Sequence, residues 1–278
     1  MPLSCRDVDV LSVGSGFGGS LTALLCRQIG LSPLVIDSGA HPRFAIGEST
    51  TPLANLVLES LAHRYRLEAL LPFTNYASWT QAHPQIGVGL KRGFSYFHHS
   101  RGRPYRPSAP HDSEWLVAAS HGPEDADTHW FRADFDHFLV QQLNAQEIPC
   151  LERTELVSLS ATTDGWRVGT REANGEPRGE ITARFLIDAS GPGGALARRL
   201  SIPDSTAALH TRSRAIYAHF KGVKPWEPLY RNVGGVSGDH PFPADAAALH
   251  HVFDGGWMWV LRFDNGVTSA RLNPDGDK

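Results

Sequence analysis

The stretch Asp7–Leu25, DVDVLSVGSGFGGSLTALL, decides the fold of this 278-residue chain. Its first part, up to Val13, has the pattern of a short apolar strand, glycines follow at 14, 16 and 19, and an apolar helical pattern continues to Gly30. The segment PLVID, residues 33–37, predicts a second strand that ends in an acid about 20 residues beyond the glycines. Because strand, glycine turn, helix and second strand occur in this order, the sequence predicts a βαβ unit that binds a dinucleotide.

Each glycine of this turn has its own expected task. Gly14 permits the tight turn, Gly16 lets the backbone approach a pyrophosphate at the helix start, and Gly19 permits close packing of the helix on the strand. Asp37 is expected to accept hydrogen bonds from a ribose 2′-hydroxyl. An acid at this position disfavours a 2′-phosphate, so NAD or FAD is expected rather than NADP. The candidate nucleotide site comprises Gly14, Gly16, Phe17, Gly18, Gly19 and Asp37.

Composition and charge exclude several other classes of protein. A net charge of −3 leaves no basic excess for a phosphate backbone, so no nucleic-acid partner is expected. The three cysteines, Cys5, Cys26 and Cys150, share no metal-ligand or CxxC spacing, and we expect reduced thiols and no metal site. Asp7 and Asp9 interrupt the first apolar stretch, and no apolar run approaches the roughly 18 residues of a membrane span. We therefore expect a cytoplasmic protein that makes no contact with a membrane.

The chain is expected to be an α/β protein with two interleaved domains. Residues 1–75 and 130–205 alternate strand and helix patterns and predict a Rossmann-like nucleotide-binding domain. Residues 76–129 and 206–278 are rich in strand patterns and predict an antiparallel-sheet domain on the substrate side.

Individual strands of this second domain can be predicted as well. Residues 85–99, QIGVGLKRGFSYFHH, alternate like a pair of strands with one exposed face. The last third predicts antiparallel strands joined by turns at Gly255-Gly256 and at Asp264–Gly266. Adjacent histidines at 98–99 and at 250–251 would face opposite ways on such strands, so we expect polar positions there rather than metal ligands.

Five segments occur in an order that resembles one known family. They are VGSGFGG at 13–19, HPRFAIGESTTP at 41–52, WFRADFDHFL at 130–139, FLIDASG at 185–191 and GGWMWV at 255–260. Together they resemble the flavin-dependent halogenases of the tryptophan halogenase type, within the two-domain FAD-dependent monooxygenases and reductases. The resemblance covers the whole chain and implies a Rossmann-like FAD-binding domain with FAD as the cofactor.

The same resemblance implies further contacts to the flavin. In that family the segment at residues 43–49 lies beside the flavin, the helix that begins at Arg132 packs along it, and residues 154–159 contact the adenine. Asp188 ends an apolar strand at a turn, where a structural role and a flavin contact are both open. The residues implied to bind FAD in this way are Arg43, Ile46, Gly47, Glu48, Ser49, Arg132 and Asp188.

Lys91, in KRGFSY, is the candidate catalytic residue. It matches the position of the family's catalytic lysine, and it is the only lysine before residue 221 in an otherwise arginine-rich chain. A desolvated amine can hold a hypohalous acid or form a chloramine with it, which an arginine that stays protonated cannot do. The alternative is a surface lysine at the edge of a strand.

Trp257 and Trp259 are the other candidate catalytic residues. Two tryptophans at positions i and i+2 of a strand share one face, and the family uses such a pair as a wall between flavin and substrate. Leu261-Arg262 replaces the family's Ile-Pro and puts halogenation in doubt, and the alternative is a pair that packs a sheet against a neighbouring layer. Further aromatic residues that could line a substrate pocket, or belong to the core, are Phe94, Tyr96, Phe97, Trp115 and Trp130.

The implied reaction is halogenation of an electron-rich, most simply aromatic, organic substrate by reduced FAD, O2 and a halide, with Lys91 delivering the halogen. A separate flavin reductase would supply reduced FAD, because SGPGGALARRL at 190–200 lacks the third glycine of a second fingerprint. One alternative is a monooxygenase or reductase of the same group. Another is an FAD-binding fragment without turnover, because the family continues to a second flavin segment whereas this sequence ends at NPDGDK, and we expect a C-terminally truncated chain.

Overall fold

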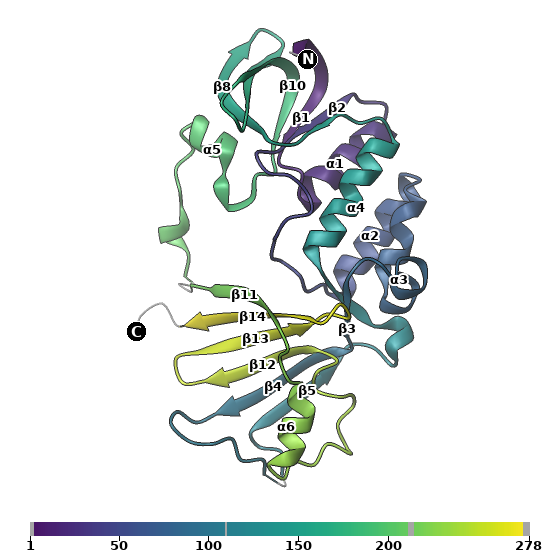
Figure 1. Ribbon diagram of the computed structural model, residues 1–278, viewed down its shortest axis with the longest axis vertical. Helices are drawn as coiled ribbons and strands as arrows, with labels where there is room; N and C mark the ends of the chain where they lie inside the picture. Colours follow the sequence, from purple (N-terminus) through teal and green to yellow (C-terminus); the bar gives the residue numbers. More distant parts are fainter. Residues whose placement is uncertain (1–2, 109, 211–213, 275–278) are drawn as a thin grey trace. The chain divides into compact units, whose positions relative to one another are not determined.

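Two compact units make up the chain in the computed structural model, which describes residues 3–108, 110–210 and 214–274. Unit 1 contains residues 1–46 and 132–207, and unit 2 contains residues 47–131 and 208–278. Each unit is therefore assembled from two separate segments of the chain (Figure 1). Within the described residues, no helix of either unit is long and apolar enough to cross a membrane.

Unit 1 is an α/β structure around one six-stranded sheet. Its elements are β1 (Leu3–Val13), α1 (Phe17–Gln28), β2 (Pro33–Ile36), α4 (Arg132–Ala145), β7 (Cys150–Leu151), β8 (Thr154–Thr162), β9 (Gly165–Glu172), β10 (Pro177–Asp188), η3 (Gly191–Gly193) and α5 (Ala195–Arg199), with η4 (Thr206–Ala208) at the boundary. The strand order is β7-β2-β1-β10-β9-β8, in which the first four strands run parallel and β9 pairs antiparallel with both β10 and β8. α1 and α4 pack against each other beside the parallel strands (Figure 1).

The parallel strands are apolar because they are buried in the core of unit 1. All of β2 is buried, and its Leu34 and Ile36 form an apolar cluster with Leu11 and Val13 of β1. Helix α1 begins after Gly16 and ends at Gln28, where Gly30 with φ 85° turns the chain toward β2. The predicted α/β fold with a Rossmann-like parallel sheet is confirmed.

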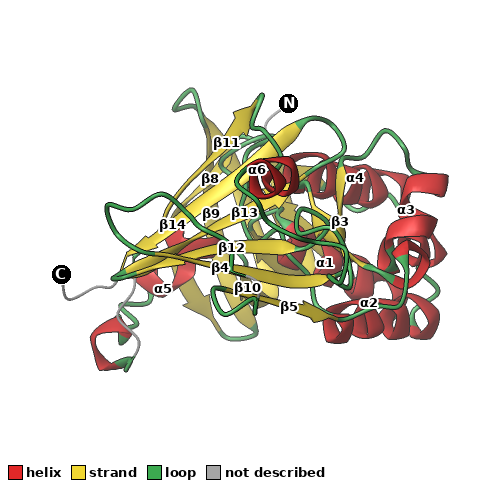
Figure 2. Cartoon of the chain, turned by 90° about the horizontal axis from the view of Figure 1, so that it is seen from below, coloured by secondary structure: helices red, strands yellow, loops and turns green. Residues whose placement is uncertain are grey.

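Unit 2 is built around a second six-stranded sheet. Its elements are α2 (Pro52–Arg64), η1 (Glu68–Thr74), α3 (Tyr76–Ala82), β3 (Val88–Lys91), β4 (Gly93–His99), β5 (Glu114–Ala118), η2 (Pro123–Asp125), β6 (Asp127–Trp130), β11 (Ile216–Lys221), α6 (Trp226–Asn232), β12 (Ala248–Phe253), β13 (Gly256–Arg262) and β14 (Val267–Pro274). The order is β11-β14-β13-β12-β4-β5, and only β12 and β4 are parallel neighbours. The short helix α6 crosses the strands on one face (Figure 2), where its Tyr230 packs on Phe97, Leu249 and Val260.

The predicted strands at residues 85–99 exist, but they are not a pair. β3 pairs with β6 in a separate two-stranded sheet, while β4 lies between β12 and β5. Only Arg92 separates β3 from β4, and one residue is too short for a hairpin, which needs at least two. The exposed face predicted for the first strand is also wrong, because Val88 and Lys91 are buried. The two predicted hairpins, β12-β13 and β13-β14, are confirmed.

Residues 47–75 belong to unit 2 by their contacts, although their sequence pattern grouped them with the nucleotide-binding domain. The carbonyl of Glu48 accepts a hydrogen bond from the amide of Trp130 at 2.6 Å, and the amide of Thr50 donates to the carbonyl of Thr128 at 3.2 Å. These bonds add a short extended segment to β6 and so attach this part of the chain to unit 2.

Candidate functional site

The turn between β1 and α1 requires glycine at two positions. Gly14 has a φ of 115°, and a Cβ added there would lie 2.2 Å from the carbonyl oxygen of Ala189. A Cβ added to Gly19 would lie 1.9 Å from the carbonyl oxygen of Gly14. Both distances are far below van der Waals contact, so helix and strand can approach this closely only because these residues lack side chains.

The first turn of α1 has the features of an anion site. Gly16 is the N-cap and provides no capping side chain, and the first turn contains no acidic residue. A Cβ on Gly16 would come no closer than 3.6 Å to its surroundings, and one on Gly18 would meet nothing within 4 Å. Amides at a helix start without a capping side chain favour a negatively charged group such as a phosphate.

Asp37, directly after β2, is buried beside this turn. Its Oδ2 accepts hydrogen bonds from the amide and hydroxyl of Ser15, at 2.7 and 2.8 Å, and from the Arg43 guanidinium at 2.8 Å. Its Oδ1 accepts one from the amide of Gly39 at 2.8 Å. Burial alone would raise the pKa of Asp37, but these hydrogen bonds and the charge of Arg43 outweigh it and lower the pKa. Asp37 is thus an ionised acceptor, and Oδ1 has room for a second donor.

Helix α4 places a fixed ion pair next to the turn. The Arg132 guanidinium donates to both carboxylate oxygens of Asp136, at 2.7 and 2.8 Å, and to the carbonyl of Ile46 at 2.8 Å. Asp136 is buried, and a Cβ added to Gly16 would lie 3.6 Å from the Asp136 carboxylate and 3.8 Å from the Arg132 guanidinium. The bidentate pairing therefore holds a planar cation within reach of the start of α1.

Asp188 and the start of β8 make local structural contacts in unit 1. The Asp188 carboxylate accepts hydrogen bonds from the amides of Leu196 and Ala197, at 2.9 and 3.1 Å, and so caps α5. Burial alone would raise the pKa of Asp188, but hydrogen bonds from Ser190 and these amides lower it. The amide of Thr154 donates to the carbonyl of Asp37 at 2.7 Å, which attaches β8 beside the end of β2.

Lys91, at the end of β3, is buried, with 1% of its side chain exposed. Its Nζ donates a hydrogen bond to the carbonyl of Thr50 and lies 3.9 Å from a carboxylate oxygen of Asp127. The ammonium group is also 4.4 Å from the ring centroid of Phe94. Burial lowers the pKa of Lys91, and Asp127 only partly opposes this. The interpretation of Lys91 as a surface lysine is therefore wrong, because β6 and the segment at Thr50 enclose the strand edge.

Two further titratable groups surround this amine. Burial raises the pKa of Asp127, with the charge of Lys91 opposing it, and the Asn55 amide donates to Asp127 Oδ1 at 2.8 Å. Burial, with a contribution from the Lys91 charge, lowers the pKa of His129 to about 3. Burial thus shifts the protonation equilibrium of Lys91 toward the neutral amine, and the Asp127 carboxylate opposes this shift.

A row of aromatic rings crosses the six-stranded sheet of unit 2, and Lys91 contacts it through Phe94. Trp115, Tyr96, His250 and Trp259 are paired in register on β5, β4, β12 and β13. The centroid distances along this row are 6.0, 4.5 and 5.5 Å. Phe94 stands next to the row, 6.4 Å from Tyr96 and 6.2 Å from His250. We call Phe94 and these four residues the aromatic row.

Not every predicted aromatic residue belongs to this row. Phe97 lies on the opposite face of β4 and packs against Tyr230. Trp130 packs against Trp79, with 6.2 Å between the ring centroids. Trp257 stands two residues before Trp259 on β13 and so shares its face.

The residue that replaces the family's proline has a defined contact. The Arg262 guanidinium donates to Asp245 at 3.1 Å and to the carbonyl of Val223 at 2.6 Å. Asp245 in turn accepts the amide hydrogens of Trp226 and Glu227 at the start of α6. β13 is an interior strand, and Arg262 pairs with Thr268 of β14 in its backbone ladder. Through Asp245, the Arg262 side chain connects the sheet to the start of α6.

The segment at residues 46–49 brings in a residue that sequence reasoning missed. Gly47 has a φ of 89°, and the Ser49 hydroxyl is buried without a hydrogen-bond partner. The buried Glu48 carboxylate lies 2.7 Å from His219 Nε2 of β11. Only the pairing of β11 into the sheet brings His219 to this position, so no sequence spacing could have revealed it.

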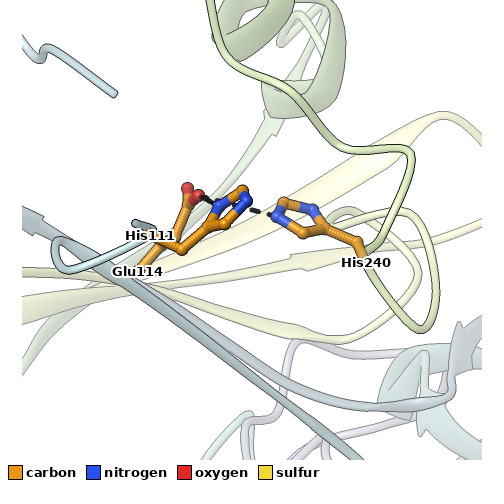
Figure 3. A group of neighbouring side chains, drawn as sticks. All are labelled: His111, Glu114 and His240. Carbon is orange, nitrogen blue, oxygen red and sulfur yellow. Dashed lines mark hydrogen bonds and ion pairs between the residues drawn. The ribbon is translucent and has the colours of Figure 1, made fainter. Parts of the chain in front are cut away.

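A second group that sequence reasoning missed contains three possible metal ligands. His111, Glu114 and His240 each offer one ligand atom, and all three atoms lie within 4.8 Å of one another (Figure 3). The signal was hidden because the residues come from the β4–β5 loop, the start of β5 and the α6–β12 loop.

Comparison with known proteins adds to this geometry. No protein-family model matches the chain. The chain is 32% identical over 262 residues to the monodechloroaminopyrrolnitrin halogenase PrnC of Pseudomonas fluorescens, covering 94% of this chain and 44% of that protein. It is 28% identical over 267 residues to the tetracycline 7-halogenase of Kitasatospora aureofaciens, with the same coverage of 94% and 44%. The crystal structure of halogenase PltM in complex with phloroglucinol and FAD matches with a TM-score of 0.82 and 27% identity, over 96% of this chain and 52% of that one.

The glycine turn, the parallel sheet and the interleaved antiparallel sheet define a two-unit dinucleotide-binding α/β protein of the flavoprotein class. Sequence and fold together point to one family. The chain is similar in both to the flavin-dependent halogenases, and it spans about half the length of the relatives that it matches.

Proposed function

We propose that unit 1 binds FAD. The uncapped start of α1 fits the pyrophosphate, because the glycines leave the amides approachable and Arg132 holds a cation nearby. The ionised carboxylate of Asp37, with one acceptor position left on Oδ1, fits a ribose hydroxyl. In this proposal Arg43 orients Asp37, while Phe17, Gly18 and Ile46 of the same unit line the cofactor.

We further propose that the chain acts as a halogenase, and the burial of Lys91 is the observation that carries this proposal. Bound reduced FAD would supply, with O2 and a halide, the hypohalous acid. The Lys91 amine can bind this acid by a hydrogen bond, or exchange one N–H for an N–halogen bond with release of water. Transfer of the halogen to an electron-rich carbon, with loss of a proton from that carbon, then restores the amine. Desolvation favours the neutral amine that these steps require.

The aromatic row gives this chemistry a matching surface for substrate. Its rings continue from the face of Phe94 against which the Lys91 ammonium rests, and Trp115 at its far end is 69% exposed. Flat π-systems prefer offset or edge contacts with one another, so an electron-rich aromatic substrate fits this surface. Trp257 and Trp259 would form the wall on the β13 side.

A separate flavin reductase would supply reduced FAD. The glycine turn between β1 and α1 is assigned to FAD. At the other described glycine turn that follows a parallel strand, between β10 and α5, the Asp188 carboxylate already accepts the amides of the helix start. This leaves no described turn for a nicotinamide dinucleotide, so the reducing equivalents would arrive from outside the chain.

The test uses chemically reduced FAD, O2 and bromide, with phloroglucinol as an electron-rich aromatic probe and mass spectrometry as the readout. Lys91→Met is compared with the wild type and with Lys221→Met, which removes an exposed lysine of β11. We expect brominated phloroglucinol from the wild type and from Lys221→Met. Lys91→Met should lose at least about 100-fold in rate, while FAD titration by absorbance shows unchanged binding.

Each other outcome would contradict a distinct part of the proposal. Oxygenated product formed without halide would identify a monooxygenase instead. Undiminished bromination by Lys91→Met would remove the lysine from the mechanism. If the wild type takes up no FAD, the chain is a fragment without turnover and the proposed cofactor site is wrong.

A further inference from the structure

His111, Glu114 and His240 point toward one another from two loops and a strand of unit 2 (Figure 3). Glu114 opens β5 and is paired in register with Phe97, so its side chain lies on the face of the sheet opposite to Trp115 and the aromatic row. His111 lies in the loop before β5, and His240 lies in the loop between α6 and β12. The group is therefore separate from the aromatic row, and also from Lys91, which lies in the two-stranded sheet of β3 and β6.

One of the separations between the ligand atoms already matches the spacing around a small divalent cation, and one is shorter. His240 Nε2 lies 3.6 Å from Glu114 Oε1, and His111 Nδ1 lies in contact with the same carboxylate oxygen. Ligand atoms bound tetrahedrally at about 2.0–2.2 Å from an ion are about 3.4 Å apart. Small rotations of these side chains would therefore place all three atoms around one ion.

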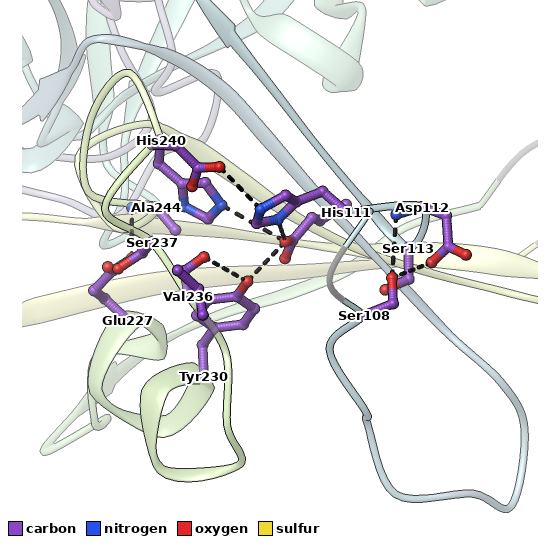
Figure 4. Close-up of polar contacts among 12 residues, drawn as sticks. Ser108, His111, Asp112, Ser113, Glu227, Tyr230, Val236, Ser237, His240 and Ala244 are labelled. Carbon is purple, nitrogen blue, oxygen red and sulfur yellow. Dashed lines mark hydrogen bonds and ion pairs between the residues drawn. The ribbon is translucent and has the colours of Figure 1, made fainter.

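Partners outside the group hold the ligands in orientation. His111 Nε2 lies 3.1 Å from the carboxylate of Asp239, so Nδ1 is the nitrogen that faces Glu114. The hydroxyls of Tyr230 and Tyr105 donate to the Glu114 carboxylate at 2.7 and 3.2 Å. Figure 4 shows Tyr230 next to His111 and His240. Histidine ligands of metals usually donate their second nitrogen to a carboxylate, and carboxylate ligands are hydrogen-bonded in the same way.

His240 is the member of this group whose ring nitrogens have no hydrogen-bond partner. Its side chain is only 7% exposed, yet neither ring nitrogen makes a hydrogen bond. A buried polar group without a hydrogen bond is costly, and most such groups have a partner. The Glu114 carboxylate is also buried, with 1% of its side chain exposed. A cation placed between them would supply the missing partner of His240 and neutralise Glu114.

We propose that His111 Nδ1, Glu114 and His240 Nε2 bind one divalent transition-metal ion, and that Zn²⁺ is the ion that fits. Two imidazoles and one carboxylate are ligands that suit Zn²⁺, whereas Mg²⁺ and Ca²⁺ prefer oxygen alone. The two positive charges of the ion balance the carboxylates of Glu114 and Asp239. The bound ion would join the β4–β5 loop to the α6–β12 loop and fix both over the core formed by Tyr230 and Phe97.

The test measures Zn²⁺ binding to the tag-free chain after removal of metals with EDTA. Isothermal titration with ZnCl2 is performed on the wild type and on His240→Gln, Glu114→Gln and Asp239→Asn. His121→Gln is the matched control, because the His121 side chain is fully exposed and pairs with Asp125 at 3.7 Å without a third ligand. Far-UV circular dichroism in EDTA establishes that each variant folds like the wild type.

We expect one Zn²⁺ per wild-type chain, and affinity at least about tenfold lower in His240→Gln and Glu114→Gln. Asp239→Asn should lose about tenfold through the orientation of His111, and His121→Gln should lose nothing. Zn²⁺ should also raise the Tm of the wild type and not that of His240→Gln. If Glu114→Gln does not fold, His240→Gln and Asp239→Asn carry the test. Absence of wild-type binding, or equal binding by His240→Gln, would overturn the proposal and leave a metal-free hydrogen-bonded network.

Discussion

Replacing Gly19 or Gly16 by alanine separates the folding role of the glycine turn from its binding role. A Cβ on Gly19 would stand 1.9 Å from the Gly14 carbonyl oxygen and 2.9 Å from the Ser12 hydroxyl. A backbone atom at the end of a buried strand cannot withdraw as a flexible side chain can, so α1 must move away from β1. Overpacking of this kind costs about 1–3 kcal/mol, and we expect the upper end, about 3 kcal/mol, for Gly19→Ala.

Gly16→Ala should leave the fold intact and weaken FAD binding. Its Cβ meets nothing closer than 3.6 Å, and its backbone, with φ −66° and ψ −179°, is one that alanine adopts readily. We therefore expect a change of less than about 0.5 kcal/mol in unfolding free energy. The methyl group nevertheless occupies the approach to the first amides of α1. Loss of a hydrogen bond to a charged phosphate costs about 1.5–3 kcal/mol, which corresponds to roughly 10- to 150-fold weaker binding.

Two measurements check this pair of variants. Urea unfolding followed by circular dichroism gives the unfolding free energy, and titration of flavin fluorescence gives the FAD dissociation constant. Gly19→Ala should have a lower unfolding free energy than the wild type. Gly16→Ala should keep the wild-type unfolding free energy and have a higher FAD dissociation constant. Wild-type affinity for FAD in Gly16→Ala would refute the assignment of the pyrophosphate to this turn. Wild-type stability of Gly19→Ala would refute the claim that helix and strand need a glycine between them.

Three further substitutions test electrostatic contacts of both units. The lowered pKa of Asp37 means that its stabilising contribution is present above the unfolded value of 3.8 and is lost as pH falls through the folded pKa. Asp37→Asn should therefore be about 2 kcal/mol less stable near neutral pH, and urea titrations should show this difference disappear in strong acid. Burial lowers the pKa of His129 to about 3 and that of His251 to about 4, so the unfolded chain binds more protons than the folded chain below the ordinary histidine pKa. Between about pH 6 and 4 these two groups should reduce the unfolding free energy by up to about 2.7 kcal/mol per pH unit on acidification, and His251→Gln should remove about half of that slope. Arg262→Ala breaks the contact with Asp245, and thermal unfolding should show a loss of about 1.5–3 kcal/mol.

Local patterns predicted the nucleotide-binding part of the chain well. The strand, turn and helix around residues 7–28 and the helix α4 follow from apolar periodicity and from glycine spacing, which depend on neighbouring residues alone. The pairing of β3 with β6 could not be predicted in this way. It depends on hydrogen bonds between segments far apart in the chain, and the alternation of β3 and β4 fits several partners equally well.

In the candidate halogenation site, too, local sequence patterns predicted some features and strand pairing decided the others. Sequence spacing predicted that Trp257 and Trp259 share a face, because alternation along a strand is a local property. It could not place His250 and Tyr96 beside Trp259, because their meeting depends on the register of β12 against both neighbours.

The sequence by itself determined the βαβ unit and its glycine turn, the acid at Asp37 and the position of the single candidate lysine. These follow from the absence of a Cβ, from short-range periodicity and from residue type. Only the tertiary structure decided that Lys91 is buried beside Thr50 and Asp127, and that His111, Glu114 and His240 meet. Burial and ligand geometry arise when distant segments pack together, and desolvation then changes the proton affinity of an amine that would stay charged in water.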